Sequence, residues 1–288
     1  MTRKVLSALL VTTFCAVTLT AQTSSGPVKG TLIITGGDQE TGIKEFVELA
    51  GGPDANIVYI PTAASSLRLP SGLIWEWLYT DTLPANTPEF QQELARMFGV
   101  KNITILHTRN QKTANSKEFV EPLRKAHGVW LSGGNPGRLS EAYLGTRTLR
   151  EIEAVLARGG VVGGNSAGAI IQGSYTIRGN PDKPVLMVKG RERGFAFLKN
   201  VAINAHLTEA MRQNELVTVL DAYPKLLGIG IDEKAGIIVK GDRFEVFGKG
   251  RVAIYDNKKY HRNWYYWLSP GDQFDLQTRT ALRASRTK

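Results

Sequence analysis

Short runs of apolar residues alternate with amphipathic stretches over the first half of the chain. Strands that are buried on both faces appear as continuous apolar runs, whereas helices place apolar residues three or four positions apart. On this basis we expect strands at residues 31–35, 57–60, 103–106, 129–131 and 161–162. We expect helices at residues 41–50, 89–98, 116–125 and 138–158, the last interrupted at Gly145. This alternation predicts a mostly parallel central sheet with helices on both faces, which is a three-layer α/β sandwich.

The pattern changes in the last third of the chain. Residues 201–204 are typical of a further strand, and residues 236–255 alternate between apolar and polar positions around two glycine-containing turns. Such alternation predicts a C-terminal extension of antiparallel hairpins along one edge of the sheet. Residues 65–88, which contain Trp75 and Trp77, fit neither pattern. We interpret them as an inserted flap or lid.

The beginning of the chain has the layout of a secretory signal peptide. Arg3 and Lys4 precede an apolar stretch that is followed by small residues. The stretch is shorter than the ~20 residues that a membrane-spanning helix needs, so we expect no stable membrane anchor. We therefore predict a secreted or periplasmic protein, with residues 1–21 removed, residues 22–29 forming a flexible start, and residues 30–288 forming one α/β domain.

Charge and cysteine content exclude several classes of function. The formal net charge is +10, but the basic residues are scattered and form no nucleic-acid motif. We interpret this charge as a solvated basic surface and expect no nucleic-acid partner. The single cysteine, Cys15, lies within the predicted leader. The mature chain is therefore expected to have no disulfide and no cysteine-based metal site, and nothing in the sequence indicates another metal or a cofactor.

The most informative segment is Gly163–Gly168, a G-x-S-x-G motif between two apolar runs. A strand that turns sharply into a helix at this motif presents its serine above the sheet edge, beside free backbone N–H groups. Ser166 is therefore our candidate nucleophile. The alternative interpretation is a loop serine between two buried elements.

A nucleophilic serine needs a base, which is most often a histidine. The chain has four histidines. His107 and His206 both follow predicted strands, whereas His127 precedes one and His261 lies in a late aromatic segment. Both His107 and His206 remain candidates on this reasoning.

A third residue should orient the base, and backbone donors should stabilise the oxyanion. Asp182, between the serine and His206 in sequence, is our choice for the acid, with Glu192 and Glu209 as alternatives. The N–H groups of Ala167 and Gly134 are the candidate oxyanion donors. The loop around Gly134 can equally serve as a helix start, with its next residue as the cap.

Several segments together resemble the cyanophycinases and the wider S51 family of serine peptidases, which also includes aspartyl dipeptidase. The resemblance runs from about Leu32 to Asp256. It is carried by residues 46–55, 60–63, 133–139, 165–169 and 227–233. It implies a fold like that of class I glutamine amidotransferases, with serine in place of cysteine and a Ser-His-acid mechanism. Ser166 matches the S-A-G turn of the family, and the family's histidine segment implies His206 rather than His107.

The chain departs from the cyanophycinase pattern at its substrate-contacting residues. Asn204 and Ala205 stand where the family has aspartate and glutamine, and Pro136 replaces another glutamine. Of the arginines that follow the histidine, Arg212 remains, and Ala210 and Glu215 occupy the other places. The resemblance implies that Asn135, Arg212 and Asn204 contact the substrate. The substitutions put the cyanophycin polymer in doubt without touching the serine chemistry.

We therefore predict a secreted serine peptidase that hydrolyses amide or isopeptide bonds in aspartate-containing peptides or polymer through an acyl-enzyme. Lys183, Arg191, Arg193 and Arg212 could hold carboxylates, although surface charge explains them equally well. The alternatives are an α-aspartyl dipeptidase-like enzyme, a divergent or non-catalytic binding protein of the same fold, and, as a weak third reading, an amidotransferase-like glutaminase. The partners expected are a peptide or a cyanophycin-like polymer and, as one option, a second copy of the chain.

Overall fold

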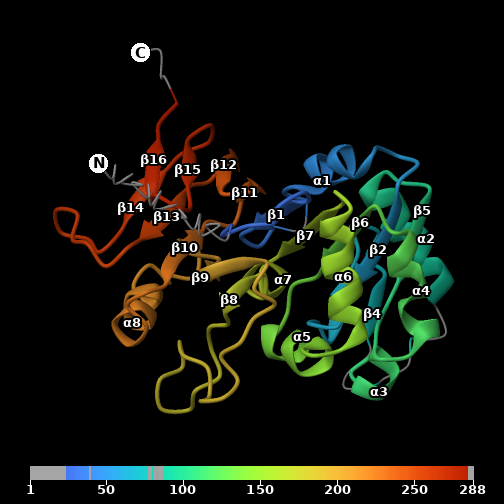
Figure 1. Ribbon diagram of the computed structural model, residues 1–288. Coiled ribbons are helices and arrows are strands. Elements are labelled where there is room, and N and C mark those ends of the chain that lie inside the picture. The colour runs from blue at the N-terminus through green and yellow to red at the C-terminus, as the bar shows by residue number, and fades with distance from the viewer. Residues whose placement is uncertain (1–23, 39, 77–79, 81–82, 84–86, 285–288) are drawn as a thin grey trace, which may run out of the picture.

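The computed structural model describes residues 24–38, 40–76, 80, 83 and 87–284 (Figure 1). The predicted signal peptide lies outside the described residues, as does Trp77. A nine-stranded sheet runs through the molecule in the order β16-β15-β12-β11-β1-β7-β6-β2-β5. Its parallel half consists of β1 (Thr31–Thr35), β2 (Asn56–Ile60), β5 (Asn102–Ile105), β6 (Gly128–Leu131) and β7 (Val161–Asn165).

Helices cover both faces of this parallel half, which confirms the predicted α/β sandwich. Ile33 faces one apolar cluster, and its neighbours Leu32 and Ile34 face another, so the strand is buried on both sides. The first cluster includes side chains of α1 (Ile43–Ala50) and α2 (Thr87–Phe98). The second includes side chains of α3 (Gln111–Ala114), α4 (Lys117–Lys125), α5 (Pro136–Tyr143) and α6 (Arg147–Ala157).

The long stretch 138–158 is two helices, separated at Leu144–Thr146 as the glycine at 145 indicates. Gly145 has a φ of 74°, which an L side chain adopts only with strain. The chain then turns back, and Pro136 at the start of α5 occupies a first-turn position where its missing N–H is not needed.

The predicted hairpin extension is present and antiparallel. β11 (Ala235–Lys240) pairs with β1, and β12 (Arg243–Gly248), β15 (Gln273–Asp275) and β16 (Thr280–Leu282) continue the sheet beyond it.

The structure contains a second, five-stranded sheet, which the sequence pattern did not distinguish from the first. Its order is β14-β13-β10-β9-β8. Its strands are β8 (Gly173–Tyr175), β9 (Leu198–Ala205), β10 (Leu227–Ile231), β13 (Val252–Tyr255) and β14 (Tyr266–Leu268). One apolar cluster contains side chains from both sheets, so they pack directly on each other, and α8 (Glu215–Ala222) covers the outer face of the second. Figure 1 shows this sheet and α8 at the side of the molecule away from α4.

Two segments differ from our interpretation of the sequence. Residues 65–88 include a small hairpin of β3 (Ser66–Arg68) and β4 (Ile74–Glu76). Residues 24–29, expected to be a loose start, are joined to the body of the protein. The backbone N–H of Ser25 donates to Asp242 (2.6 Å), and that of Gly241 donates to Pro27 (3.2 Å). None of the helices among the described residues is long and apolar enough to cross a bilayer.

Candidate active site

The serine of the G-x-S-x-G motif sits at a strained bend between β7 and the short helix α7 (Ala167–Ile170). Its backbone has φ 51° and ψ −113°, which is uncommon for any residue other than glycine. Hydrogen bonds fix this bend, because the N–H of Ser166 donates to Thr35 and its carbonyl accepts from Ala169 and Ile170. A side chain at Gly168 would overlap the backbone of Leu131. The bend therefore requires small residues and holds the hydroxyl at the carboxyl end of β7, as the sequence predicts.

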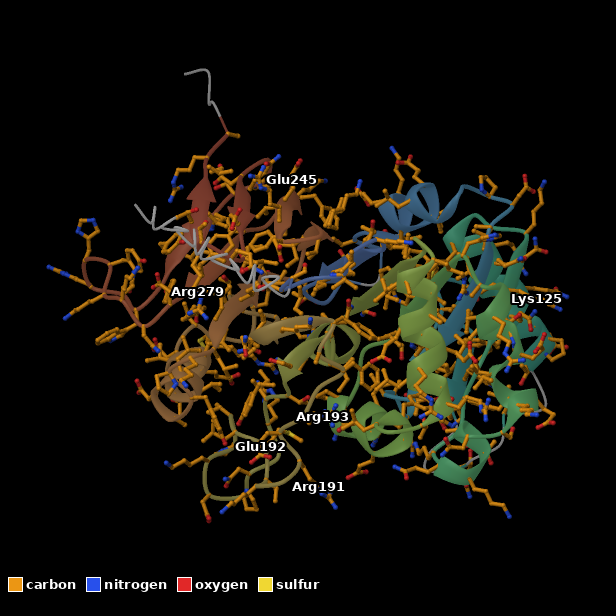
Figure 2. All side chains as sticks on the ribbon, in the orientation of Figure 1. Lys125, Arg191, Glu192, Arg193, Glu245 and Arg279 are labelled. Carbon is orange, nitrogen blue, oxygen red and sulfur yellow. The ribbon has the colours of Figure 1, made fainter. Side chains whose placement is uncertain are left out.

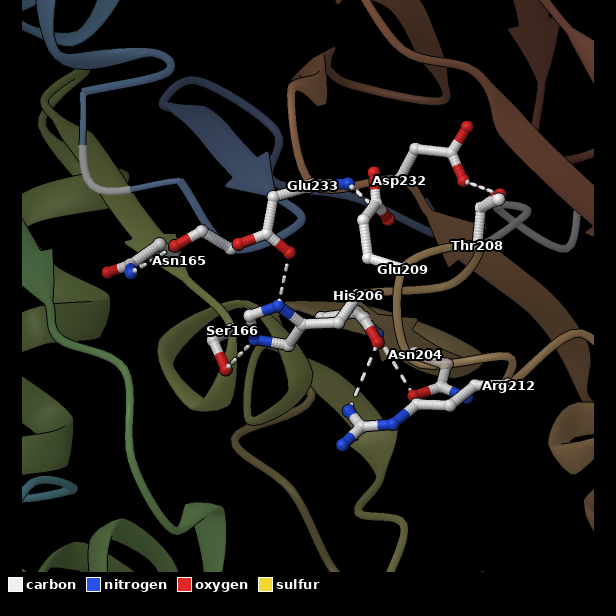
Figure 3. Close-up of polar contacts among 11 residues, drawn as sticks. Asn165, Ser166, Asn204, His206, Thr208, Glu209, Arg212, Asp232 and Glu233 are labelled. Carbon is white, nitrogen blue, oxygen red and sulfur yellow. Dashed lines mark hydrogen bonds and ion pairs between the residues drawn. The ribbon is translucent and has the colours of Figure 1, made fainter.

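The base that meets this hydroxyl is His206. It directly follows β9, and its own φ of 55° turns the side chain away from the strand direction. Its Nε2 lies 2.8 Å from the Oγ of Ser166 (Figure 3). The structure therefore brings together the serine and the histidine that the family resemblance implies.

The acid at the other imidazole nitrogen is Glu233, which corrects our choice of Asp182. The Oε2 of Glu233 lies 2.5 Å from Nδ1 of His206 (Figure 3), and the two side chains are 30% and 28% exposed. Asp182 instead belongs to an exposed turn in which its N–H donates to the side chain of Asn180. Glu209, an alternative, accepts from the N–H of Glu233 and does not make this contact with the imidazole.

A signal for Glu233 was present in the sequence. It follows the apolar run 227–231, and a carboxylate just beyond a buried strand lies at the edge of the sheet where active sites form. Gly37 packs closely against the His206–Glu233 pair, because a methyl group at this position would overlap both the imidazole and the carboxylate. The carbonyl of Gly37 in turn accepts from the side chain of Asn165 (3.2 Å).

The competing histidines are held elsewhere. His107 is buried, with Nδ1 3.0 Å from the hydroxyl of Thr62 and Nε2 3.0 Å from the carbonyl of Thr80. Nδ1 of His127 accepts from the N–H of Asn56 (2.9 Å), at the opposite end of the parallel strands from Ser166. Neither is paired with the serine, which leaves His206 as the base.

The glycine loop between β6 and α5 lies beside the serine. A methyl group at Gly133 would come within 3.3 Å of the Ser166 Cβ. Gly134 has a φ of 133° and packs against the backbone of Ala63, so only glycine fits there. The side chain of Asn135 caps α5 by accepting from Gly137 (2.8 Å). The same loop therefore caps α5 and lies beside the serine. The N–H groups of Gly134 and Ala167 remain the predicted oxyanion donors.

A cavity of about 780 Å³ opens beside the serine. Ser166, His206, Gly134 and Asn135 line it. Its charged lining residues are mostly arginines, namely Arg178, Arg191, Arg193 and Arg212, with Glu141. Figure 2 shows Arg191, Glu192 and Arg193 on the long segment between β8 and β9, beside α5. Guanidinium groups in such a lining can bind carboxylates and other anionic groups.

The other two residues that the resemblance implied as substrate contacts differ in position. Arg212 lines the cavity, and its Nη1 donates to the carbonyl of Ala205 (3.2 Å). Burial lowers the pKa of Arg212, and the nearby charge of Arg178 lowers it further. Asn204 is fully buried and donates to the carboxylate of Glu215 (3.0 Å), so it acts behind the cavity wall. Sequence reasoning missed Arg178, which no motif identifies.

Among the described residues, no group of three or more His, Cys, Asp or Glu side chains is placed to hold a metal ion. The groups with chemical function that the structure places at the site include the Ser166 hydroxyl, the His206 imidazole, the Glu233 carboxylate and the surrounding guanidinium groups.

Comparison with known proteins finds similarity to peptidases over most of the chain. The sequence model of peptidase family S51 matches residues 30–247. A cyanophycinase from Geminocystis herdmanii is 27% identical over 235 residues, which cover 79% of this chain and 80% of that protein. A cyanophycinase from Thermosynechococcus vestitus is 28% identical over 275 residues, 87% of this chain and 80% of the relative. The crystal structure of a peptidase from an acI-B1 actinobacterium superposes with a TM-score of 0.64 at 22% identity, covering 87% of this chain and 98% of its own.

Proposed function

The chain belongs to peptidase family S51, and we propose that it is a serine peptidase that cleaves amide or isopeptide bonds in aspartate-containing peptides through an acyl-enzyme. The observation that carries the proposal is the continuous contact from Ser166 through His206 to Glu233, with distances of 2.8 and 2.5 Å. This is the arrangement in which a serine is activated by a base that a carboxylate orients.

The mechanism uses these three side chains in turn. Nε2 of His206 takes the proton of Ser166 as Oγ attacks the amide carbonyl carbon, and Glu233 stabilises the imidazolium that forms. The N–H groups of Ala167 and Gly134 donate to the oxyanion. His206 then passes its proton to the leaving amine, and the C–N bond breaks. A water molecule, deprotonated by the same imidazole, hydrolyses the ester and restores the Ser166 hydroxyl.

The cavity supports carboxylate-bearing substrates, because four arginines and a single glutamate are its charged lining residues apart from the histidine. The relatives named above are cyanophycinases, but this chain has lost several of the polar residues of that pattern. Short aspartyl peptides therefore fit the proposal better than the polymer does. We also propose export, supported by the signal-peptide layout of residues 1–21. The intact mass of the protein recovered from the periplasm or medium tests this.

Replacing the serine tests the assignment. Ser166→Ala should lower kcat on β-aspartyl dipeptides by about 10³-fold or more, because the acyl-enzyme can no longer form. Labelling by a serine-directed phosphonate should disappear with it. Ser140→Ala is the matched control, because that hydroxyl lines the same cavity but donates to the carbonyl of Arg193. Undiminished hydrolysis by Ser166→Ala, or labelling that persists, would contradict the proposal.

A further inference from the structure

Arg178 has an unusual backbone for a residue of its type. It lies three residues beyond the end of β8, and its φ of 78° is in the left-handed region. Its N–H donates to the carbonyl of Val185 (3.0 Å), which helps to hold this conformation. A residue other than glycine at such an angle is strained, and strain of this kind collects at functional sites. The Arg178 side chain forms part of the cavity wall beside Ser166.

Glu215 holds this guanidinium, and Asn204 in turn holds the carboxylate of Glu215. The Nη2 of Arg178 lies 2.9 and 2.8 Å from the two carboxylate oxygens of Glu215, at the start of α8. The buried side chain of Asn204 donates to the same carboxylate (3.0 Å) and accepts from the N–H of Ala205 (3.0 Å). The side chains of Arg178 and Glu215 are 34% and 21% exposed, so solvent screens this pair only in part.

Among the described residues, the two carboxylates in contact with cavity arginines, Glu215 and Glu141, are already paired, whereas Arg212 is not. Glu215 is paired with Arg178, and Glu141 is paired with Arg191 (2.6 Å). Arg212 makes no ion pair with any carboxylate in the described part of the chain. A guanidinium on a substrate would have to displace Arg178 in order to reach Glu215. A carboxylate would meet two adjacent positive groups without breaking any existing contact.

We propose that Arg178 and Arg212 form a carboxylate subsite, and that Arg178 prevents Glu215 from receiving a basic side chain. The enzyme then prefers aspartyl peptides with a second carboxylate over those that carry arginine. This inference rests on the proposed function for its reaction, but the binding preference is independent of catalysis.

The test measures binding to the Ser166→Ala protein, which holds peptides without cleaving them. The probes are three dipeptides, β-Asp-Glu, β-Asp-Gln and β-Asp-Arg, measured by calorimetry. We expect β-Asp-Glu to bind about tenfold or more tighter than β-Asp-Arg, with β-Asp-Gln between them, because hydrogen bonds to charged groups contribute that much. Adding Arg178→Asn should weaken β-Asp-Glu by about tenfold and tighten β-Asp-Arg, because Glu215 becomes accessible. Asparagine tolerates the left-handed backbone, which limits the risk of misfolding.

The control is Arg124→Asn in the same Ser166→Ala background. Arg124 is also ion-paired with glutamates, namely Glu121 and Glu151, but it lies on α4 outside the cavity. It removes the same charge and should leave all three dissociation constants within about twofold. Glu215→Gln tests the opposite direction, because it releases Arg178 from its ion pair without deleting it. β-Asp-Glu should then bind at least as tightly as before, and β-Asp-Arg should stay weak.

Equal affinity for β-Asp-Glu and β-Asp-Arg, no binding of any of the three, a preference that survives Arg178→Asn, or a preference that is lost in Glu215→Gln would overturn the subsite. Wild-type protein that binds with the expected preference but cleaves nothing would instead contradict the proposed function and leave the subsite standing.

Discussion

At the scale of single residues, the site depends on two strained backbones. Ser166 and His206 both have positive φ, and each directly follows a strand, β7 or β9. A regular strand would direct each side chain to a face of its own sheet. The turn at each residue directs its side chain toward the other residue, so the strain is located where the proton is exchanged.

The first prediction concerns the acid. Glu233→Gln should lower kcat by about 10³- to 10⁴-fold and change KM little, because an amide can hold the ring but cannot stabilise the imidazolium and permits the wrong tautomer. Steady-state kinetics on a cleaved β-aspartyl dipeptide measures this. Asp182→Asn is the control and should keep kcat within about twofold of wild type, because its exposed side chain belongs to a separate turn. The opposite ranking of the two variants would restore Asp182 as the orienting acid.

The serine and the acid of the site differ in how far the sequence can predict them. Ser166 is recognisable because a strand, a bend and a helix are adjacent in the chain. Glu233 reaches His206 only because β9 and β10 pair in parallel, with Ala205 opposite Ile231. The residues that follow these two positions then lie side by side. Without that pairing, acidic residues elsewhere in the chain are equal candidates, and Asp182 was preferred because it lies between the serine and His206 in sequence.

At the scale of secondary-structure elements, the parallel strands are predictable because both of their faces are buried. The apolar runs of β1, β2, β5, β6 and β7 carry that information locally. The residues of a strand do not by themselves determine the sheet to which it belongs. β11 and β13 are both largely apolar, yet β11 pairs with β1 of the first sheet and β13 with β10 of the second. Tertiary packing decides between them, which is why the second sheet was missed.

Packing also determines the role of the hairpin β3–β4. We interpreted its surroundings as a flap, but Trp75 is 1% exposed and its ring lies 4.3 Å from that of Phe90 on α2. No residue of the hairpin lines the cavity beside Ser166. The described part of this segment therefore belongs to the core beneath α2.

Trp75→Ala should destabilise the protein by about 3–5 kcal/mol, because it removes a large buried ring and leaves a cavity. Urea denaturation at pH 7 measures the change in unfolding free energy, and kcat of the protein that remains folded should be unchanged. Ile74→Ala is the matched control, because Ile74 is its neighbour on the same strand but is 42% exposed. A loss of kcat with little loss of stability would instead favour a lid.

At the scale of the whole molecule, the first described residues connect the two sheets. The carbonyl of Ser25 accepts from Lys199 on β9 of the second sheet (2.8 Å). Its N–H donates to Asp242, in the turn between β11 and β12 of the first. Gln277 also donates to Asp242 (3.1 Å). A segment near the predicted processing site thus contacts both sheets, the second through a backbone carbonyl and the first through the Asp242 carboxylate.

The pKa of Asp242 makes this connection sensitive to pH. Partial burial raises its pKa, but hydrogen bonds from the N–H of Ser25, the side chains of Gln277 and Ser24, and the N–H of Gly26 lower it more. The pKa in the folded protein is therefore below the usual 3.8. A carboxylate whose pKa is lower in the folded than in the unfolded state stabilises the protein at pH values above its unfolded-state pKa. This stabilisation is lost as the pH falls through the folded-state pKa.

Asp242→Asn should therefore lower the unfolding free energy by about 1 kcal/mol at pH 7. We expect less than a buried hydrogen bond to a charged group contributes, because the site is largely solvated. The difference from wild type should shrink as the pH falls below 3.8, where the wild-type carboxylate takes up its proton. Urea titrations of both proteins between pH 7 and about pH 3 measure this. Asp54→Asn is the control, because Asp54 makes only an exposed ion pair with Lys101 and should change stability by less than about 0.5 kcal/mol. A difference for Asp242→Asn that stays constant or grows toward low pH would show that the carboxylate does not join the segment to the fold.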